Sequence, residues 1–437
     1  MADWKPTWPT RPEYDEAIKQ WRTNVNDAEL KAANLATMPT GGPARYGGAG
    51  LYITFYKLGN FQARCFCSNI DEHINPPTDI VERYQRISQY ITAKQAEVPA
   101  LIPTTYVEHG IYVAKNWRPV IKTQWLNNTR RLGSYIADYY NDTNRMRTLG
   151  EAWRQMIGQL EAVGIAHGDL DLTNVLIQEA GGQPQLRLID YDNMWVPLLA
   201  GKAQTECGHK PFQHPQFFRP GDKPNPANRP FDAEMDRFSA LVIYLSLLAI
   251  SIRPALYNEL GAREDERLLF SRDDYDNPTL ATSNIERMRA KCGAPVEPYV
   301  RELRAALEQR RMPRSLADIA SGKGAAASVP LTATPRAFVP PPPAEMSKPL
   351  GARVPIATAG PAPSNSTAQP GRAQYQLPVS PATPRPNPNW PAQPYSQPLP
   401  PVPATKAKRS GSVGTVVVWS IAIFIALLII LSAFHVI

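Results

Sequence analysis

The chain has 437 residues, including 45 prolines, and a formal net charge of +8 at pH 7. This length allows two or three ordinary domains and a large core. The charge is localised, because eight Lys and Arg and only one Glu lie between Ser328 and Ser410, which gives this stretch +7. The rest of the chain is therefore close to neutral. A nucleic-acid-binding fold needs a clustered basic face, so we predict no nucleic-acid partner.

The first third of the chain predicts a helical extension followed by a β-hairpin. In residues 1–39, apolar side chains recur at helical spacing, at Tyr14, Ala17, Ile18 and Trp21. Glycines follow, and then two extended runs rich in β-branched and aromatic residues are joined near "KLGN", which is typical of a hairpin. Cys65 and Cys67 are two residues apart in the second run, so a strand would place both on one face, where we expect them to pack as reduced thiols.

The remaining elements predict an α+β protein. We expect a helix from Ile80 to Gln95, strands from Tyr106 to Val113 and from Val120 to Trp125, and a helix that ends at Gly164. The apolar run "DRFSALVIYLSLLAI" is about 15 residues long, which favours a buried helix over a membrane span. A sheet-rich first part followed by a helical second part predicts two lobes.

One stretch, "HGDLDLTNVLIQEAGGQPQLRLIDYDNMW", places two carboxylates and an amide at the ends of apolar runs. It resembles the catalytic loop (H-R-D-L-x-x-x-N) and the metal-binding loop (D-F-G) of protein kinases. The resemblance implies that Asp169 is the base that orients the attacking hydroxyl. It implies that Asn174 and Asp190 hold Mg²⁺ on the phosphates of ATP.

Other segments extend the resemblance over roughly residues 40 to 320. "FQARCF" resembles the strand that carries the phosphate-binding lysine, with Arg64 at that position. The resemblance implies that the nucleotide also contacts a glycine loop and a hinge, which would contain Gly47, Gly48, Gly50, Gln124, Trp125 and Leu126. The spacing allows Glu82 to be the ion-pair partner of Arg64, and a surface glutamate explains it equally well.

The second half of the chain carries two further parts of the kinase pattern. "GHKPFQHPQ" resembles the end of the activation segment, and Asp236 falls where the central helix of kinases has a buried aspartate. We therefore predict a two-lobed protein kinase-like domain over residues 40–325. "RCF" followed by "ERYQRIS" resembles a bacterial group of kinase-like proteins with an arginine at this position, so the expected class is a bacterial eukaryotic-like serine/threonine kinase or pseudokinase.

Several residues depart from the kinase pattern. Arg64 replaces the lysine that contacts the phosphates, and Asp171 replaces a lysine near the transferred phosphate. Gly168 replaces the arginine beside the catalytic aspartate, and Asp192 replaces the glycine of D-F-G. Loss of one positioned charge can cost several kcal/mol of transition-state stabilisation, so an active kinase and a pseudokinase both remain open. A zinc site at Cys207, His209 and His214 is the weaker alternative, because no second ligand group follows.

The C-terminal region predicts a linker and a membrane anchor. Residues 326–410 are proline-rich and basic, which favours a disordered polyproline II spacer or a docking site for a polyproline-binding module. Val413 to Ile437 contains no Asp, Glu, Lys or Arg, and a helix of about 25 residues can cross a hydrocarbon layer of ~30 Å. "KAKRS" precedes it, so we predict a transmembrane helix over residues 411–437 with the kinase-like domain in the cytoplasm.

These observations leave three hypotheses for function. The first is a membrane-anchored, ATP-dependent protein kinase that phosphorylates Ser or Thr of a protein substrate. The second is a weak or inactive pseudokinase that binds a signalling partner at the membrane. The third is a small-molecule phosphotransferase, because "HGD" with glycine also occurs in kinases of antibiotics and choline.

Overall fold

The computed structural model describes residues 5–38, 41–44, 52–204, 206–263, 266–323 and 331. All of them belong to one unit within Met1–Ser347. The predicted glycine loop (Gly47, Gly48 and Gly50), most of the linker and the predicted transmembrane segment lie outside the described residues.

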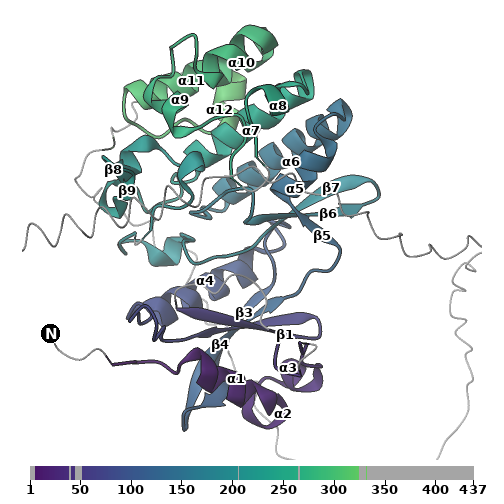
Figure 1. The fold of residues 1–437 in the computed structure, drawn as a ribbon, viewed down its shortest axis with the longest axis vertical. Helices are drawn as coiled ribbons and strands as arrows, with labels where there is room; N and C mark the ends of the chain where they lie inside the picture. The colour runs from purple at the N-terminus through teal and green to yellow at the C-terminus, as the bar shows by residue number, and fades with distance from the viewer. Residues whose placement is uncertain are drawn as a thin grey trace, which may run out of the picture. The chain divides into compact units, whose positions relative to one another are not determined.

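A four-stranded antiparallel sheet forms the N-terminal part of the fold (Figure 1). Its strands are β1 (Ile53–Leu58), β2 (Phe61–Phe66), β3 (Thr104–Val113) and β4 (Asn116–Gln124), in the order β1-β2-β4-β3. β1 and β2 form the predicted hairpin, and its two-residue turn uses a positive φ of 54° at Gly59. The register pairs Arg64 with Phe55 of β1 and with Ile121 of β4, which places Arg64 in the interior of the sheet.

Helices cover both faces of this sheet (Figure 1). The helices are α1 (Arg11–Lys19), α2 (Trp21–Asn24) and α3 (Ala28–Ala32) on one face and α4 (Ile80–Lys94) on the other. Because side chains alternate along a strand, Ala63, Cys65 and Cys67 join the core with α1 to α3, whereas Phe66 packs against α4. The prediction that the two cysteines share one buried face as free thiols is confirmed.

The larger part of the fold is mostly helical, and α6 and α7 lie at its centre. Its helices are α5 (Leu132–Tyr139), α6 (Thr143–Ala162), α7 (Arg237–Ile252), α8 (Leu256–Glu259), α9 (Arg272–Asp276), α10 (Asn284–Cys292), α11 (Glu297–Glu308) and α12 (Leu316–Ser321). The Asp142 carboxylate caps the start of α6, and Gly164 follows its end at a φ of +66°. α7 is buried on nearly all sides, as its sequence predicts.

A short sheet brings the predicted metal ligands together. It contains β5 (Thr129–Arg131), β6 (Val175–Ala180) and β7 (Gln183–Leu188), and a separate ribbon joins β8 (Phe218–Arg219) to β9 (Lys223–Pro224). β6 and β7 form a hairpin whose turn is Gly181-Gly182, both at positive φ, which suits a type I′ turn. The register pairs Val175 with Leu188, so Asn174, just before β6, lies beside the segment that leaves β7 toward Asp190.

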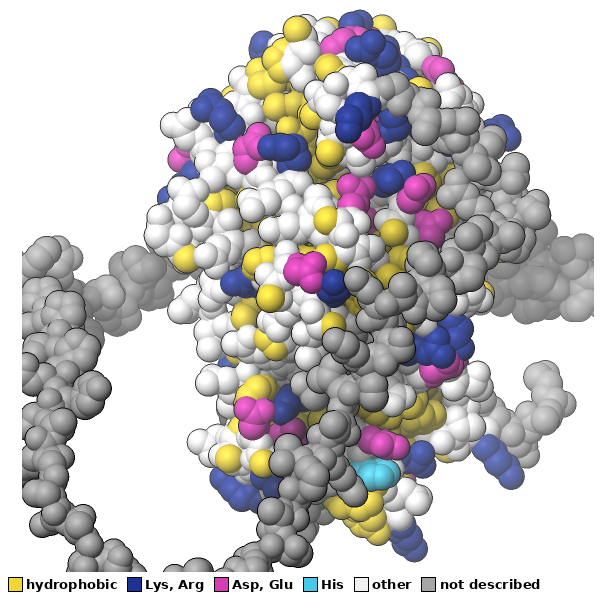
Figure 2. All heavy atoms as spheres, turned by 180° about the vertical axis from the view of Figure 1, so that it is seen from behind, with side chains coloured by type: hydrophobic (Ala, Val, Ile, Leu, Met, Phe, Trp, Pro, Cys, Tyr) yellow, Lys and Arg dark blue, Asp and Glu magenta, His cyan; other side chains and the backbone are white. Residues whose placement is uncertain are grey.

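The sequence therefore predicted the sheet-rich first part and the helical second part correctly. The helices and strands expected between Ile80 and Gly164 are present. Most of them begin or end a few residues away from the predicted positions. Among the described helices, none is long and apolar enough to cross a membrane. On the face shown in Figure 2, basic and acidic side chains are interspersed and are not gathered by sign.

Candidate active site

The loop from His167 to Asn174 is held by Asp236, the residue immediately before α7. The buried Asp236 carboxylate accepts hydrogen bonds from the backbone N–H groups of His167 and Gly168, the second at 2.8 Å. The buried His167 ring accepts from the Asp169 N–H through Nδ1, so Nε2 carries the proton and donates to the Ile189 carbonyl at 2.8 Å. One histidine thus joins the catalytic loop to the segment that carries Asp190.

Only glycine fits at position 168. Gly168 has a φ of +82°, and a Cβ there would lie 2.2 Å from the carbonyl oxygen of Asn193. The same Gly168 carbonyl accepts a hydrogen bond from the buried guanidinium of Arg229, which also donates to the Glu206 carbonyl at 3.2 Å. Replacement of the usual arginine by glycine therefore lets the loop approach the Asn193 backbone.

Asp169 and Asn174 are in direct contact. The Asn174 Nδ2 group donates to the Asp169 carbonyl at 2.9 Å and to its Oδ2 at 3.1 Å. The amide nitrogen is used in this way, so Oδ1 of Asn174 is left as an oxygen of the type that Mg²⁺ prefers. Burial and the neighbouring Asp171 raise the pKa of Asp169, and the hydrogen bond from the His209 backbone opposes this shift.

The segment that carries Asp190 runs alongside Asn174. The Ile189 N–H donates to the Asn174 carbonyl at 3.0 Å, which continues the β6–β7 hairpin by one step. Asp190 itself has a φ of +66°, a conformation that Asp and Asn tolerate better than most residues. Its side chain is 45% exposed, so the carboxylate can meet a ligand, and its oxygens, like Oδ1 of Asn174, are of the type that Mg²⁺ prefers.

Arg64 is bound to the loop after β7. Its Nη2 donates to Asp190 Oδ1 at 2.6 Å, and its Nη1 donates to Asp192 Oδ1 at 2.5 Å and to the Tyr84 hydroxyl. The guanidinium also lies 4.8 Å from the centre of the Phe55 ring. The Arg64 side chain is only 9% exposed, and each of its two terminal nitrogens bonds one carboxylate.

The suggested ion pair between Arg64 and Glu82 is wrong. The Glu82 carboxylate bonds Lys202 at 2.6 Å and Arg86 at 2.5 Å. Tyr84 is the α4 residue that contacts Arg64. The reason is helical geometry, because the buried face of α4 contains Ile80, Tyr84 and Ile87, and Glu82 lies ~200° around the helix from Tyr84.

Asp171 faces its own loop. Its Oδ1 accepts from the backbone N–H groups of Thr173 and Asn174, both at 2.8 Å, and its Oδ2 lies 3.1 Å from His209 Nδ1. Burial acts to raise the pKa of Asp171, but these hydrogen bonds outweigh it and leave the pKa below its usual range. The carboxylate is therefore a fixed anion that organises the loop and does not meet an incoming phosphate directly.

Asp192 depends on Arg64 for its charge. Burial raises the pKa of Asp192, and the coulombic attraction and hydrogen bond of Arg64 lower it only in part. Its position in place of the kinase glycine thus gives the arginine a second carboxylate partner.

The predicted hinge follows β4. Gln124 ends that strand, and its backbone N–H donates to the Pro103 carbonyl at 3.1 Å. The Trp125 N–H donates to the Asn60 carbonyl at 2.8 Å, so this amide is already engaged. Leu126 is half-buried and forms no backbone hydrogen bond with another described residue, which makes it the hinge position with free backbone groups.

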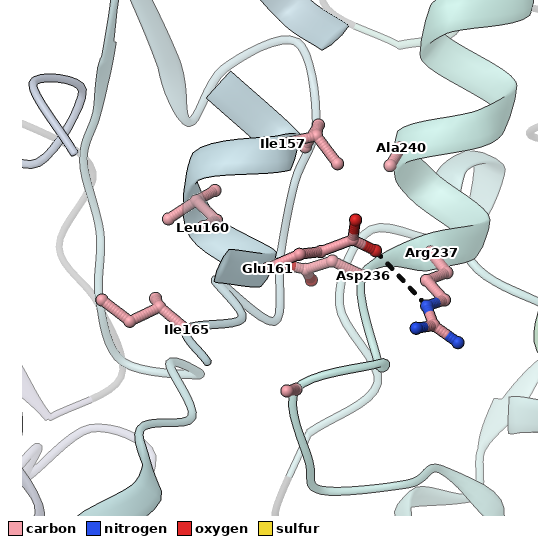
Figure 3. A pocket seen from close by; sticks show the side chains of 8 residues that line it. Ile157, Leu160, Glu161, Ile165, Asp236, Arg237 and Ala240 are labelled. Atoms are coloured by element: carbon pink, nitrogen blue, oxygen red, sulfur yellow. Dashed lines mark hydrogen bonds and ion pairs between the residues drawn. The ribbon is translucent and has the colours of Figure 1, made fainter. Parts of the chain in front are cut away.

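A small cavity lies behind the catalytic loop, between the end of α6 and the start of α7 (Figure 3). Ile157, Leu160 and Ile165 line it together with the Glu161–Arg237 ion pair, whose atoms are 3.3 Å apart. Asp236 also lines it, but Asp169, Asn174 and Asp190 do not. We therefore assign this cavity to packing behind the loop and do not place a nucleotide in it.

The alternative zinc ligands have other partners. Cys207 is buried and its thiol donates to the Phe217 carbonyl at 3.1 Å. His214 is buried, and burial lowers its pKa to about 4, while its Nδ1 accepts from the Gln216 N–H. His209 bonds Asp171. Each of the three side chains already has a hydrogen-bond partner of its own within the fold, so we do not assign a zinc site to them.

Two residues of this site, Tyr84 and Arg229, and one contact, between Arg64 and Asp192, were not identified from the sequence. Tyr84 had a detectable signal, because it shares the helical spacing of Ile80 and Ile87. Arg229 and the pairing of Asp192 with Arg64 had none, since they depend on contacts between segments more than 60 residues apart.

One family model matches a part of the chain that includes the loop. A family model described as "Lipopolysaccharide kinase (Kdo/WaaP) family" matches residues 73–205. This match fits the protein kinase-like superfamily. The matched region includes Asp169, Asn174 and Asp190, whereas Arg64 and His209 lie outside it. No curated protein matches the chain.

Proposed function

We propose that this protein is an ATP-dependent phosphotransferase that uses Mg²⁺ and transfers phosphate to an alcohol hydroxyl. The observation that carries the proposal is the contact of Asn174 with Asp169, at 2.9 and 3.1 Å, on a loop that the β6–β7 hairpin places beside the segment of Asp190. These are the three side chains that phosphoryl transfer requires at one place.

In this proposal each side chain has one role. The carboxylate of Asp190 and Oδ1 of Asn174 hold Mg²⁺, which neutralises charge on the phosphates when bound. Asp169 accepts the proton of the acceptor hydroxyl, and its raised pKa gives it more basicity than an ordinary aspartate. Arg64, whose buried guanidinium lies 2.6 Å from Asp190, serves as the phosphate contact.

The acceptor we favour is a saccharide hydroxyl, because the matched family is named for lipopolysaccharide kinases. Ser or Thr of a protein is the second candidate, favoured by the resemblance of Gly208 to Gln216 to an activation segment. The ion pair between Arg64 and Asp190 favours a third, a nucleotide-binding pseudokinase that acts as a signalling scaffold, because this pair competes with the metal for Asp190. In each case we propose that Val413 to Ile437 anchors the protein to a membrane.

The test uses purified full-length protein with Mg²⁺ and γ-labelled ATP, and offers lipopolysaccharide and a Ser/Thr-rich protein as acceptors. MgATP should raise the melting temperature of the wild type by the amount that its affinity sets, and Asp190→Asn should lose this shift. Asp222→Asn is the matched control, because Asp222 also has a positive φ, of 60°, and binds Lys210 on the surface.

The outcomes separate the candidates. Label on lipopolysaccharide supports the saccharide kinase, and label on protein alone supports the protein kinase. A melting shift without transfer supports the nucleotide-binding scaffold. If MgATP causes no melting shift and no label is transferred, the proposed function is refuted. An equal melting shift in wild type and Asp190→Asn would show that Asp190 is not part of the site.

A further inference from the structure

A second chain segment closes over the catalytic aspartate. The backbone N–H of His209 donates to Asp169 Oδ1 at 2.7 Å. The preceding Gly208 has a φ of +74°, and a Cβ there would lie 2.7 Å from the same Oδ1 and 3.1 Å from the Gly168 carbonyl. Glycine at position 208 is therefore what allows this peptide to approach the carboxylate so closely.

The same residue places its side chain against the catalytic loop. His209 Nδ1 lies 3.1 Å from Oδ2 of Asp171, whose other oxygen is held by the amides of Thr173 and Asn174. This fixed anion sets the orientation of the imidazole, with Nδ1–H toward Asp171. Nε2 is then directed away from Asp171, and it forms no hydrogen bond with any residue that the structure describes. The His209 side chain is 35% exposed, so it can meet a ligand.

We propose that His209 supplies the positive charge beside Asp169 that protein kinases obtain from the lysine at the position of Asp171. In this arrangement Nε2–H of the imidazolium contacts the phosphate group that is transferred, and Asp171 orients the ring and stabilises its charge. The pair His209–Asp171 thus replaces one lysine by a cation held on a neighbouring segment. The inference rests on the proposed phosphotransferase function and adds a phosphate-contacting residue to it.

The charged groups around His209 favour the imidazolium. The hydrogen bond with Asp171 raises the pKa of His209 above its usual value, and the charges of Asp171, Asp169 and Glu266 add to this effect, while burial opposes it. Phe212 supplies an apolar edge, with ring centres 5.5 Å apart. A raised pKa keeps the cation fully present at acid pH and loses it as the pH rises through the pKa of the folded protein.

The kinetic test compares His209→Gln and His209→Lys in the full-length protein, with His109→Gln as control. His109 lies exposed on β3 and takes no part in the site. We expect His209→Gln to lower kcat by about tenfold or more with little change in the KM for ATP, because the lost charge acts on the transferred phosphate. His209→Lys should recover most of this loss, and it should remove the fall in wild-type activity that follows as the pH rises above the ordinary histidine pKa of 6.5.

A second measurement does not depend on turnover. The chain has six histidines, so ¹³Cε1-histidine labelling gives few resonances, and His209→Gln assigns the one of interest. Magnesium with a non-hydrolysable ATP analogue should raise the pKa of His209, because nearby phosphate charge favours the imidazolium. The resonance of His214, which is buried outside the site and whose pKa burial lowers to about 4, should not change when the analogue binds.

The two measurements distinguish the possible failures. If the analogue binds but the pKa of His209 does not change, this inference is overturned and the proposed function stands. The same conclusion follows if the turnover of His209→Gln is within twofold of the wild-type turnover. Absence of analogue binding, checked by melting of the same sample, overturns the proposed function and this inference together.

Discussion

Arg64 allows a quantitative test of how the site is held together. Arg64→Ala removes a guanidinium that is 9% exposed and bonds two carboxylates, Asp190 at 2.6 Å and Asp192 at 2.5 Å. Breaking a buried ion pair from one side costs about 3–5 kcal/mol, because the remaining charge is left without a partner. The Asp192 side chain is still 20% exposed and that of Asp190 45%, so we expect the lower end, about 3 kcal/mol, at pH 8.

The loss should depend on pH in a defined direction. Burial raises the pKa of Asp192 even with Arg64 present, and removal of Arg64 raises it further. A raised carboxyl pKa means that the folded protein holds the proton more tightly than the unfolded chain, so its stability is lost as the pH rises through the folded-state pKa. At pH 5 part of the unpaired charge is neutralised, and the deficit of Arg64→Ala should be smaller than at pH 8.

The assay is urea unfolding followed by circular dichroism at both pH values, with the double variant Arg64→Ala/Asp192→Asn. Removal of the orphaned carboxylate should recover most of the loss, to within about 1 kcal/mol of wild type. Arg154→Ala is the control, because its ion pair with Glu151 is on the surface and should contribute at most about 1 kcal/mol. A deficit that is equal at both pH values, or a double variant no more stable than Arg64→Ala, would show that the reasoning is wrong.

Three further predictions concern catalysis, the catalytic loop and location. Arg64→Lys should lower kcat/KM by roughly tenfold in steady-state kinetics, since one ammonium cannot reproduce two directed contacts, and an unchanged value would contradict the phosphate-contact role. Gly168→Ala should destabilise the protein by about 1–3 kcal/mol more than Gly182→Ala in urea unfolding. Both glycines have positive φ, but a Cβ at Gly182 meets nothing within 4 Å, so equal losses would refute the clash with Asn193. Deletion of Val413 to Ile437 should release the protein from membranes in a high-salt wash, and a variant that still pellets would remove the anchor assignment.

The sequence predicted best those features that depend on local periodicity. The β1–β2 hairpin, the shared face of Cys65 and Cys67, and the buried α7 each follow from side-chain spacing within one element. The catalytic loop was found because its residues are close in sequence and their chemistry is specific.

The partner of Arg64 could not be found in the same way. Arg64 and Asp192 are 128 positions apart, and no spacing rule relates them. Kinase spacing made Glu82 one of two open readings, a partner of Arg64 or a surface glutamate, and spacing alone does not show which face of α4 is buried. The role of Asp171 was equally hidden, because a carboxylate beside phosphates is unfavourable until the amides and the imidazole that satisfy it are known.

The ion pair between Arg64 and Asp190 also has a consequence for how ligands enter. Under the proposed function, Mg²⁺ needs Asp190 and the phosphates need Arg64, yet in the free protein these two side chains satisfy each other at 2.6 Å. Either ligand alone must break the pair and leave one charge exposed, whereas the two together satisfy both. For each ~1.4 kcal/mol of free energy by which this ion pair stabilises the free protein, the apparent affinity for a single ligand falls tenfold. Metal and nucleotide should therefore bind with positive cooperativity, and by reciprocity each should strengthen the other by the same factor.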